Sequence, residues 1–127
     1  MTLRPMLIAA ALPLAACTAQ MDDGQRDIRA PAATVTGAAE SCVSTNRIRS
    51  TEVQDDYTID FVMTGGDRYR NTLPNRCNAL GFGRSIAYST STGRLCDVDI
   101  VDVIDSSGTR MGTCALGEFV PVELVED

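Results

Sequence analysis

The stretch from Tyr57 to Leu73 reads YTIDFVMTGGDRYRNTL, and the expected fold follows from it. Apolar side chains occupy alternate positions from residue 57 to residue 63, which is typical of a strand with one buried face. Thr64-Gly65-Gly66 then fits a three-residue hairpin loop, because Gly66 can adopt the left-handed conformation that such a loop requires. The loop sets the register of the two strands, and the expected cross-strand pairs are Ile59–Asn71, Asp60–Arg70, Phe61–Tyr69 and Val62–Arg68.

Short runs of the same kind recur along the chain, with turn residues between them. They lie at about residues 46–53, 57–63, 67–73, 84–90, 94–104, 109–114 and 119–124. The fifth run changes phase near Ile100, which predicts a β-bulge there. Apart from one helical turn after Pro74, the chain is expected to be all-β. We expect a small antiparallel barrel or rolled sheet of about six to seven short strands.

Residues 1–16 read MTLRPMLIAAALPLAA, in which Arg4 is the single charged residue and precedes an apolar stretch. A stable transmembrane helix needs ~20 apolar residues, so the stretch is too short to span a bilayer and is expected to be a secretory signal. Leu14-Ala15-Ala16-Cys17 resembles the lipobox of bacterial lipoproteins, in which a peptidase cuts before a lipid-modified cysteine. An ordinary secretory signal with a coincidental cysteine is the alternative.

The lipobox resemblance implies a mature chain that begins at Cys17 and is held to a membrane by several acyl chains, such as palmitate. Thr18 resembles the outer-membrane sorting pattern of proteobacterial lipoproteins, so the expected location is the periplasmic side of the outer membrane. A soluble periplasmic or secreted protein is the alternative. Residues 17–40 have no strand or helix periodicity and are expected to form a flexible tether, and residues 41–127 the folded domain.

Four cysteines in the expected domain form an even set: Cys42, Cys77, Cys96 and Cys114. In an exported chain such a set predicts two disulfides. A zinc site is the alternative, which the lack of histidine and of CxxC spacing disfavours. Sequence alone leaves three pairings open. The expected antiparallel order of the runs favours Cys42–Cys96 and Cys77–Cys114, because each pair would then meet at one end of the sheet.

The chain of 127 residues carries a net charge of −6. Removal of residues 1–16, which include Arg4, changes the net charge to −7. This acidic balance disfavours nucleic acid as a partner. The chain contains no histidine and no lysine, which excludes Ser-His and Cys-His pairs, Schiff-base lysines and the phosphate-loop lysine. We therefore expect a non-catalytic protein without a cofactor or a metal ion.

The expected domain resembles a family of small exported proteins of alphaproteobacteria and their relatives, a domain of unknown function. The matching strings are SCVSTNRIRST (41–51), YTIDF (57–61), YRNTLPNRC (69–77), LGF (80–82), LCDVDI (95–100) and GTCALGEF (112–119). YRNTLPNRC is the most specific of them. The resemblance implies an exported domain framed by cysteines and assigns no catalytic or binding residue.

Arginines are the main candidates for binding, because they alternate in two of the expected strands. The candidate residues are Arg47, Arg49, Arg68, Arg70 and Arg76. They are expected to project from the face opposite Ile59 and Phe61. Arginine binds carboxylates and phosphates with two parallel hydrogen bonds, so the expected partner is an envelope protein or an anionic polymer. The alternative is a solvated face that nearby acids neutralise.

A small-ligand binder or an enzyme is the rival function, with a site at the barrel mouth formed by Asn71, Asn75 and carboxylates. Four acids are interpreted as a solvated strand face, since they lack the residue order of a calcium loop: Asp97, Asp99, Asp102 and Asp105. The aromatic residues are expected in the core: Tyr57, Phe61, Tyr69, Phe82 and Tyr88.

Overall fold

The expected hairpin lies at the centre of the structure. Strand β4 (Thr58–Met63) and strand β5 (Arg68–Thr72) pair antiparallel, with all four cross-strand pairs that the loop predicts. Gly65 and Gly66 in the connecting loop have φ angles of 93° and 96°. Residues with a Cβ rarely adopt such angles, so this turn depends on both glycines.

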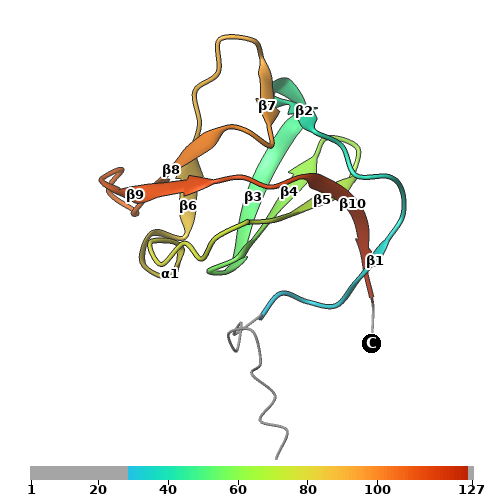
Figure 1. Ribbon diagram of the computed structural model, residues 1–127, viewed down its shortest axis with the longest axis horizontal. Coiled ribbons are helices and arrows are strands. Elements are labelled where there is room, and N and C mark those ends of the chain that lie inside the picture. Colours follow the sequence, from blue (N-terminus) through green and yellow to red (C-terminus); the bar gives the residue numbers. More distant parts are fainter. Residues whose placement is uncertain (1–28, 126–127) are drawn as a thin grey trace, which may run out of the picture.

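The computed structural model describes residues 29–125, and Figure 1 shows their arrangement. Besides β4 and β5, the strands are β1 (Ala33–Val35), β2 (Cys42–Ser44), β3 (Ile48–Asp55), β6 (Ser85–Ala87), β7 (Arg94–Cys96), β8 (Ile100–Ile104), β9 (Arg110–Ala115) and β10 (Phe119–Leu124). Two short helical turns complete the set, the 3-10 turn η1 (Thr45–Arg47) and the α-helical turn α1 (Leu80–Gly83). In this part of the chain no helix has the length and apolar character needed to cross a membrane.

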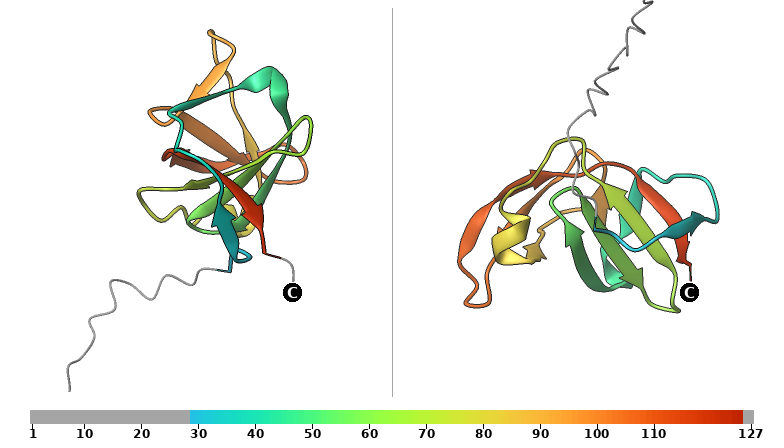
Figure 2. Two further views of the ribbon diagram at one scale, coloured as in Figure 1. Left: turned by 90° about the vertical axis from the view of Figure 1, so that its right-hand side faces the viewer. Right: turned by 90° about the horizontal axis from the view of Figure 1, so that it is seen from below.

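The strands form three antiparallel sheets, which confirms the all-β fold. The largest has the order β1-β10-β5-β4-β3, the smallest consists of β2 and β7, and the third has the order β6-β8-β9. Residues 29–125 form no closed barrel, so the rolled sheet is the one of the two predicted forms that is observed. In the right-hand view of Figure 2 the β6-β8-β9 sheet and the five-stranded sheet form the two sides of an arch.

One hydrophobic core joins the three sheets. Phe61 on β4 and Phe119 on β10 contact each other edge to face, with ring centroids 5.2 Å apart. Val101 and Val103 on β8 and Leu95 on β7 belong to the same buried cluster. All three sheets therefore contribute side chains to one buried core, and the fold depends on this shared core because each sheet is small.

The predicted run 94–104 is wrong as a single strand. The chain leaves β7 at Cys96 and turns before β8 begins at Ile100 in a different sheet. The carboxylate of Asp99 accepts a hydrogen bond of 2.7 Å from the backbone N–H of Cys96, a local contact that stabilises a turn. The phase shift near Ile100 is thus the end of one strand and the start of the next.

The predicted tether also needs correction for residues 33–40. Strand β1 pairs with β10, and Glu40 exchanges backbone hydrogen bonds of 2.8 and 2.9 Å with Phe119. Pairing to an edge strand uses backbone groups, so it does not require the side-chain alternation on which the prediction relied. The expected signal and Cys17 lie outside the described residues.

Both predicted disulfides are present. Cys42 and Cys96 lie directly opposite each other on β2 and β7, with their Cα atoms 4.0 Å apart. Cys77, in the loop before α1, is joined to Cys114 on β9 with a Cα separation of 5.8 Å. The first bond joins the two strands of the smallest sheet, and the second fixes the loop that follows β5 to the third sheet.

Removing the Cys42–Cys96 bond by Cys42→Ala with Cys96→Ala should lower the free energy of unfolding by about 4 kcal/mol, because the bond closes a long loop in the unfolded chain. Denaturant unfolding of the oxidised proteins measures this difference. Full reduction of the unsubstituted protein serves as the control and should lower stability by more, since it opens both bonds. Equal stability of the double variant and the oxidised parent would contradict the prediction.

Candidate functional site

Two of the candidate arginines converge on one buried carboxylate. Asp60 on β4 is fully buried, and its neighbours on β5 are Arg68 and Arg70. Arg70 donates from Nε and Nη2 to the two carboxylate oxygens at 2.9 and 3.1 Å, a bidentate pair. Arg68 donates from Nη1 to Asp60 Oδ2 at 2.9 Å. The alternation of β4 and β5 brings all three side chains to the outer face of the sheet.

Further contacts enclose this ion cluster. Gln54 on β3 donates to Asp60 at 3.2 Å, and Arg68 donates to Glu52 at 2.7 Å. The hydrogen bond to Glu52 is the main cause that raises the pKa of Arg68, with a smaller contribution from Asp60 and against the lowering effect of burial. Two arginines thus face two carboxylates, and the cluster has no excess positive charge.

The chain that leads into β1 crosses the same face. The carbonyl oxygen of Pro31 accepts a hydrogen bond of 2.7 Å from Arg70. The backbone N–H groups of Arg29 and Ala30 donate to Asp55 at 3.0 and 3.2 Å. These contacts attach residues 29–31 to β3 and β5, so the incoming chain covers part of the predicted binding face.

The predicted arginine surface is therefore wrong as a single patch. The side chains of Arg68 and Arg70 are only 17% and 16% exposed, because their guanidinium groups are used within the fold. Arg47 lies in η1, where strand alternation does not apply, and Arg49 is the additional residue at a β-bulge in β3. Arg76 lies in the loop after β5 and pairs with Asp56 at 3.0 Å.

Three other arginines gather at one end of the domain. Arg47, Arg49 and Arg94 are exposed, and within residues 29–125 their side chains make no ion pair or hydrogen bond. Thr45 donates two hydrogen bonds to the carbonyl of Gly93, at 2.9 Å from its N–H and 3.0 Å from its hydroxyl, which places η1 beside the start of β7. We call these three residues the distal arginine cluster.

The distal arginine cluster lies away from the point where the described chain begins. Figure 1 shows β2, β7 and the start of β3 at the top, and the first described residues at the bottom. Sequence reasoning missed Arg94, since its place beside η1 depends on the pairing of β7 with β2. The expected Cys42–Cys96 bond was the available signal, because it brings these two segments together.

Two acids, Glu40 and Asp67, lie near Arg47 of this cluster, since all three act on the phenol of Tyr69. Burial is the largest cause of the raised pKa of Tyr69, followed by a hydrogen bond with Glu40. Tyr69 therefore helps to hold Glu40, and with it the chain between β1 and β2, against the sheet.

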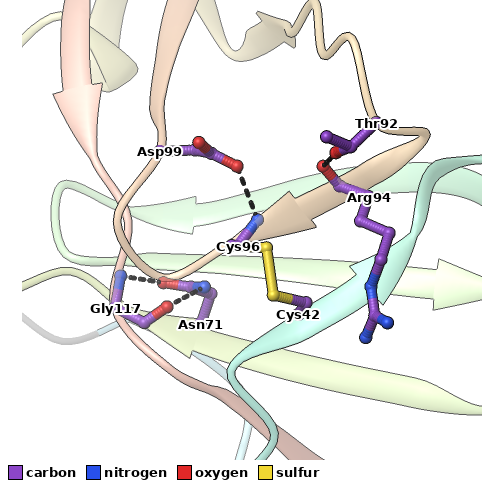
Figure 3. The surroundings of a disulfide bond; sticks show 7 residues. All are labelled: Cys42, Asn71, Thr92, Arg94, Cys96, Asp99 and Gly117. Carbon is purple, nitrogen blue, oxygen red and sulfur yellow. Dashed lines mark hydrogen bonds between the residues drawn. A yellow bond between two sulfur atoms is a disulfide. The ribbon is translucent and has the colours of Figure 1, made fainter.

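The rival ligand site at a barrel mouth is not formed. Asn71 is fully buried, and its amide donates to the carbonyl of Gly117 at 2.7 Å and accepts from the N–H of Gly117 at 2.8 Å. Figure 3 shows this reciprocal pair near the Cys42–Cys96 disulfide. Both functions of the amide are occupied, so Asn71 joins β5 to the chain before β10 and is not available to a ligand. Asn75 is exposed in the loop after β5.

The four acids expected on a strand face have separate positions. Asp97 and Asp99 lie in the turn after β7, Asp102 on β8 pairs with Arg110 on β9 at 3.0 Å, and Asp105 lies in the next turn. Hydrogen bonds from Ser107 and from the N–H of Thr109 lower the pKa of Asp105. Among the described residues, no group of three or more potential metal ligands is present.

Comparison with known proteins identifies no relative. No protein-family model matches the chain, and no curated protein or solved structure shows significant similarity to it. The resemblance to small exported alphaproteobacterial proteins therefore stays a prediction.

Replacing Asp60 by Asn should destabilise the domain by about 3–5 kcal/mol, because two partly buried guanidinium groups then lose their shared carboxylate. Asp102→Asn removes an exposed ion pair and is the matched control, with an expected loss below about 1 kcal/mol. Denaturant unfolding of both variants gives the comparison. Equal losses would show that the Asp60 cluster is no more important to the fold than a surface pair.

Proposed function

We propose that this protein is a lipid-anchored, non-catalytic binding module of the cell envelope, on the periplasmic side of the outer membrane. Its anchor is Cys17, and its partner is an anionic envelope protein or polymer bound by the distal arginine cluster. The observation that carries the proposal is the set of exposed arginines without an ion pair or side-chain hydrogen bond within residues 29–125, on a protein whose net charge is −6. Unpaired guanidinium groups on an acidic domain provide a local site for carboxylates or phosphates.

The architecture supports an adaptor that holds its partner away from the membrane. The chain enters at one end of the domain, and the distal arginine cluster lies at the other (Figure 1). Two disulfides and the Asp60 cluster connect the strands between the two ends. A rigid domain between an anchor and a basic surface is suited to connecting a membrane with an acidic partner.

The choice of these arginines revises the sequence-based proposal. Arg47 and Arg49 remain candidates, whereas Arg68 and Arg70 neutralise Asp60 and Glu52. Arg94 takes their place, because it is exposed beside η1. Figure 3 shows its side chain running alongside the Cys42–Cys96 disulfide.

Crosslinking in living cells tests the partner. The chain contains no lysine, so a photo-crosslinking amino acid at the exposed Asn46 is preferable to amine-reactive reagents. We expect an adduct that mass spectrometry identifies, and a loss of about tenfold or more when Arg47, Arg49 and Arg94 are all replaced by Glu, since acids repel an anionic partner. Arg110→Glu, on the exposed face of β9, should keep the adduct. An adduct that survives the triple replacement would refute the proposed surface.

Cell fractionation and labelling with a palmitate analogue test the anchor. Cys17→Ser should abolish labelling and release the protein from the outer-membrane fraction, because the thiol is the expected attachment point for the acyl chains. Thr18→Ala retains this cysteine and should remain labelled. Unchanged labelling of Cys17→Ser would exclude lipidation at this position.

A further inference from the structure

A second group of arginines surrounds a pocket at the other end of the domain. The pocket has a volume of about 320 Å³ and lies between α1 and the turn that joins β3 to β4. Arg29, Arg76 and Arg84 line it together with Asp55 and Asp56. Within this lining Arg76 pairs with Asp56, and Arg84 adds a further positive charge.

The two acids of the pocket are already engaged. Asp55 accepts backbone hydrogen bonds from Arg29, Ala30 and Tyr57, at 3.0, 3.2 and 2.8 Å. Asp56 accepts from Arg76 at 3.0 Å. Arg84 is exposed, and within residues 29–125 its side chain has no ion pair or hydrogen bond. The pocket therefore presents the guanidinium group of Arg84 to a ligand. The two carboxylates beside it already accept hydrogen bonds from other groups of the protein.

The walls of the pocket are held in place by covalent and backbone contacts. Cys77 is bonded to Cys114, and its N–H donates to the carbonyl of Asp56 at 2.8 Å. Arg84 ends α1 in the left-handed conformation, with φ 61°, and its N–H donates to the carbonyl of Leu80 at 3.2 Å. Glycine is the usual residue at this angle after a helix, because it has no Cβ. In this protein the position is occupied by an arginine.

An exposed aromatic residue lies two positions before Arg84 in the chain. Phe82 in α1 is 77% exposed, which corrects the prediction that it belongs to the core. Figure 1 shows α1 and the first described residues on the lower side of the domain. An exposed aromatic ring on a surface that also carries arginines is typical of surfaces that bind a membrane interface.

The position of the pocket also brings it near the expected anchor. Residues 18–28 separate Cys17 from Arg29. Even fully extended, a segment of this length spans only about 40 Å. An anchor at Cys17 would hold the lower side of the domain within this distance of the membrane surface.

We infer that this pocket binds the phosphate of an anionic phospholipid in the membrane that carries the anchor. Arg76 and Arg84 contact the phosphate, and Phe82 enters the interfacial region of the bilayer. The inference rests on the proposed function for the nearness of the membrane, whereas the chemistry of the pocket is independent of lipidation. Bound in this way, the domain would direct the distal arginine cluster away from the membrane.

The overall negative charge opposes this binding but does not outweigh it. Charges more than about 8 Å apart are largely screened at physiological salt, so the acids on the far side contribute little at the pocket. Asp22, Asp23 and Asp27 precede the described chain and are the nearest acids in sequence. Their carboxylates are the alternative ligand for the pocket arginines, and the test below distinguishes them from a phospholipid.

Vesicle co-sedimentation of the mature chain, residues 17–127 with Cys17→Ser, tests the pocket without the anchor. We expect binding to vesicles of phosphatidylcholine with phosphatidylglycerol, and none to phosphatidylcholine alone. Replacing Arg76 and Arg84 by Gln should lower the partition coefficient roughly 25-fold, at roughly fivefold per arginine. Arg84→Gln alone should lower it about fivefold. Arg110→Gln removes one exposed arginine from β9, outside both arginine groups, and is the matched control for Arg84→Gln. Phe82→Ala should weaken binding several-fold.

Three results would overturn the inference. They are an absence of binding to phosphatidylglycerol vesicles, equal losses in Arg84→Gln and Arg110→Gln, and binding that appears only after Asp22, Asp23 and Asp27 are replaced by Asn. The last result would show that the chain's own acids occupy the pocket. Because the tested chain carries no lipid, a failure here leaves the labelling and crosslinking tests of the proposed function unaffected.

Discussion

The carboxylate of Asp60 is the charge around which the largest sheet is organised. It is fully buried on the middle strand of the β3-β4-β5 group, and it accepts hydrogen bonds from Gln54, Arg68 and Arg70. A buried carboxylate is costly unless such partners compensate it, so the outer face of these strands has to assemble as a unit. Through Arg70 the same cluster holds Pro31 and guides the incoming chain to β1. The edge of the sheet and the entry point of the chain thus depend on one side chain.

This arrangement places eight of the nine arginines in residues 29–125 in three groups, and the ninth, Arg110, pairs with Asp102. Those beside Asp60 are neutralised inside the fold and contribute to stability. The distal arginine cluster lacks partners in the described chain and is the basis of the proposed envelope binding. The arginines around the pocket lie on the side where the described chain begins, and α1 with the exposed Phe82 is on the same side. Residues of one type and similar sequence spacing therefore have different chemical surroundings, and spacing alone does not distinguish them.

Local patterns account for the predictions that the structure confirms. The hairpin register follows from alternation and from two glycines whose φ angles fit the loop. The disulfide pairing is also confirmed, but Cys42–Cys96 lies within a separate two-stranded sheet and not at one end of a single sheet. The failures involve contacts with distant segments. Strand β1 is stabilised by β10, the break after Cys96 separates two sheets, and Phe82 lies outside the core that its apolar character predicted.

The sequence by itself determined the all-β class, the central hairpin and the set of cysteines available for bonding, because these depend on neighbouring residues and on backbone geometry. It also supplied the arginines as the chemically informative residues. Only the tertiary structure decided which of them are exposed, since each guanidinium group pairs with whatever carboxylate the fold brings near. Asp60 and Arg70 meet across a hairpin, whereas Arg94 lies beside η1 through a pairing of two segments far apart in the chain. Long-range strand pairing depends on the packing of the whole domain, so it cannot be predicted from the pattern of neighbouring residues.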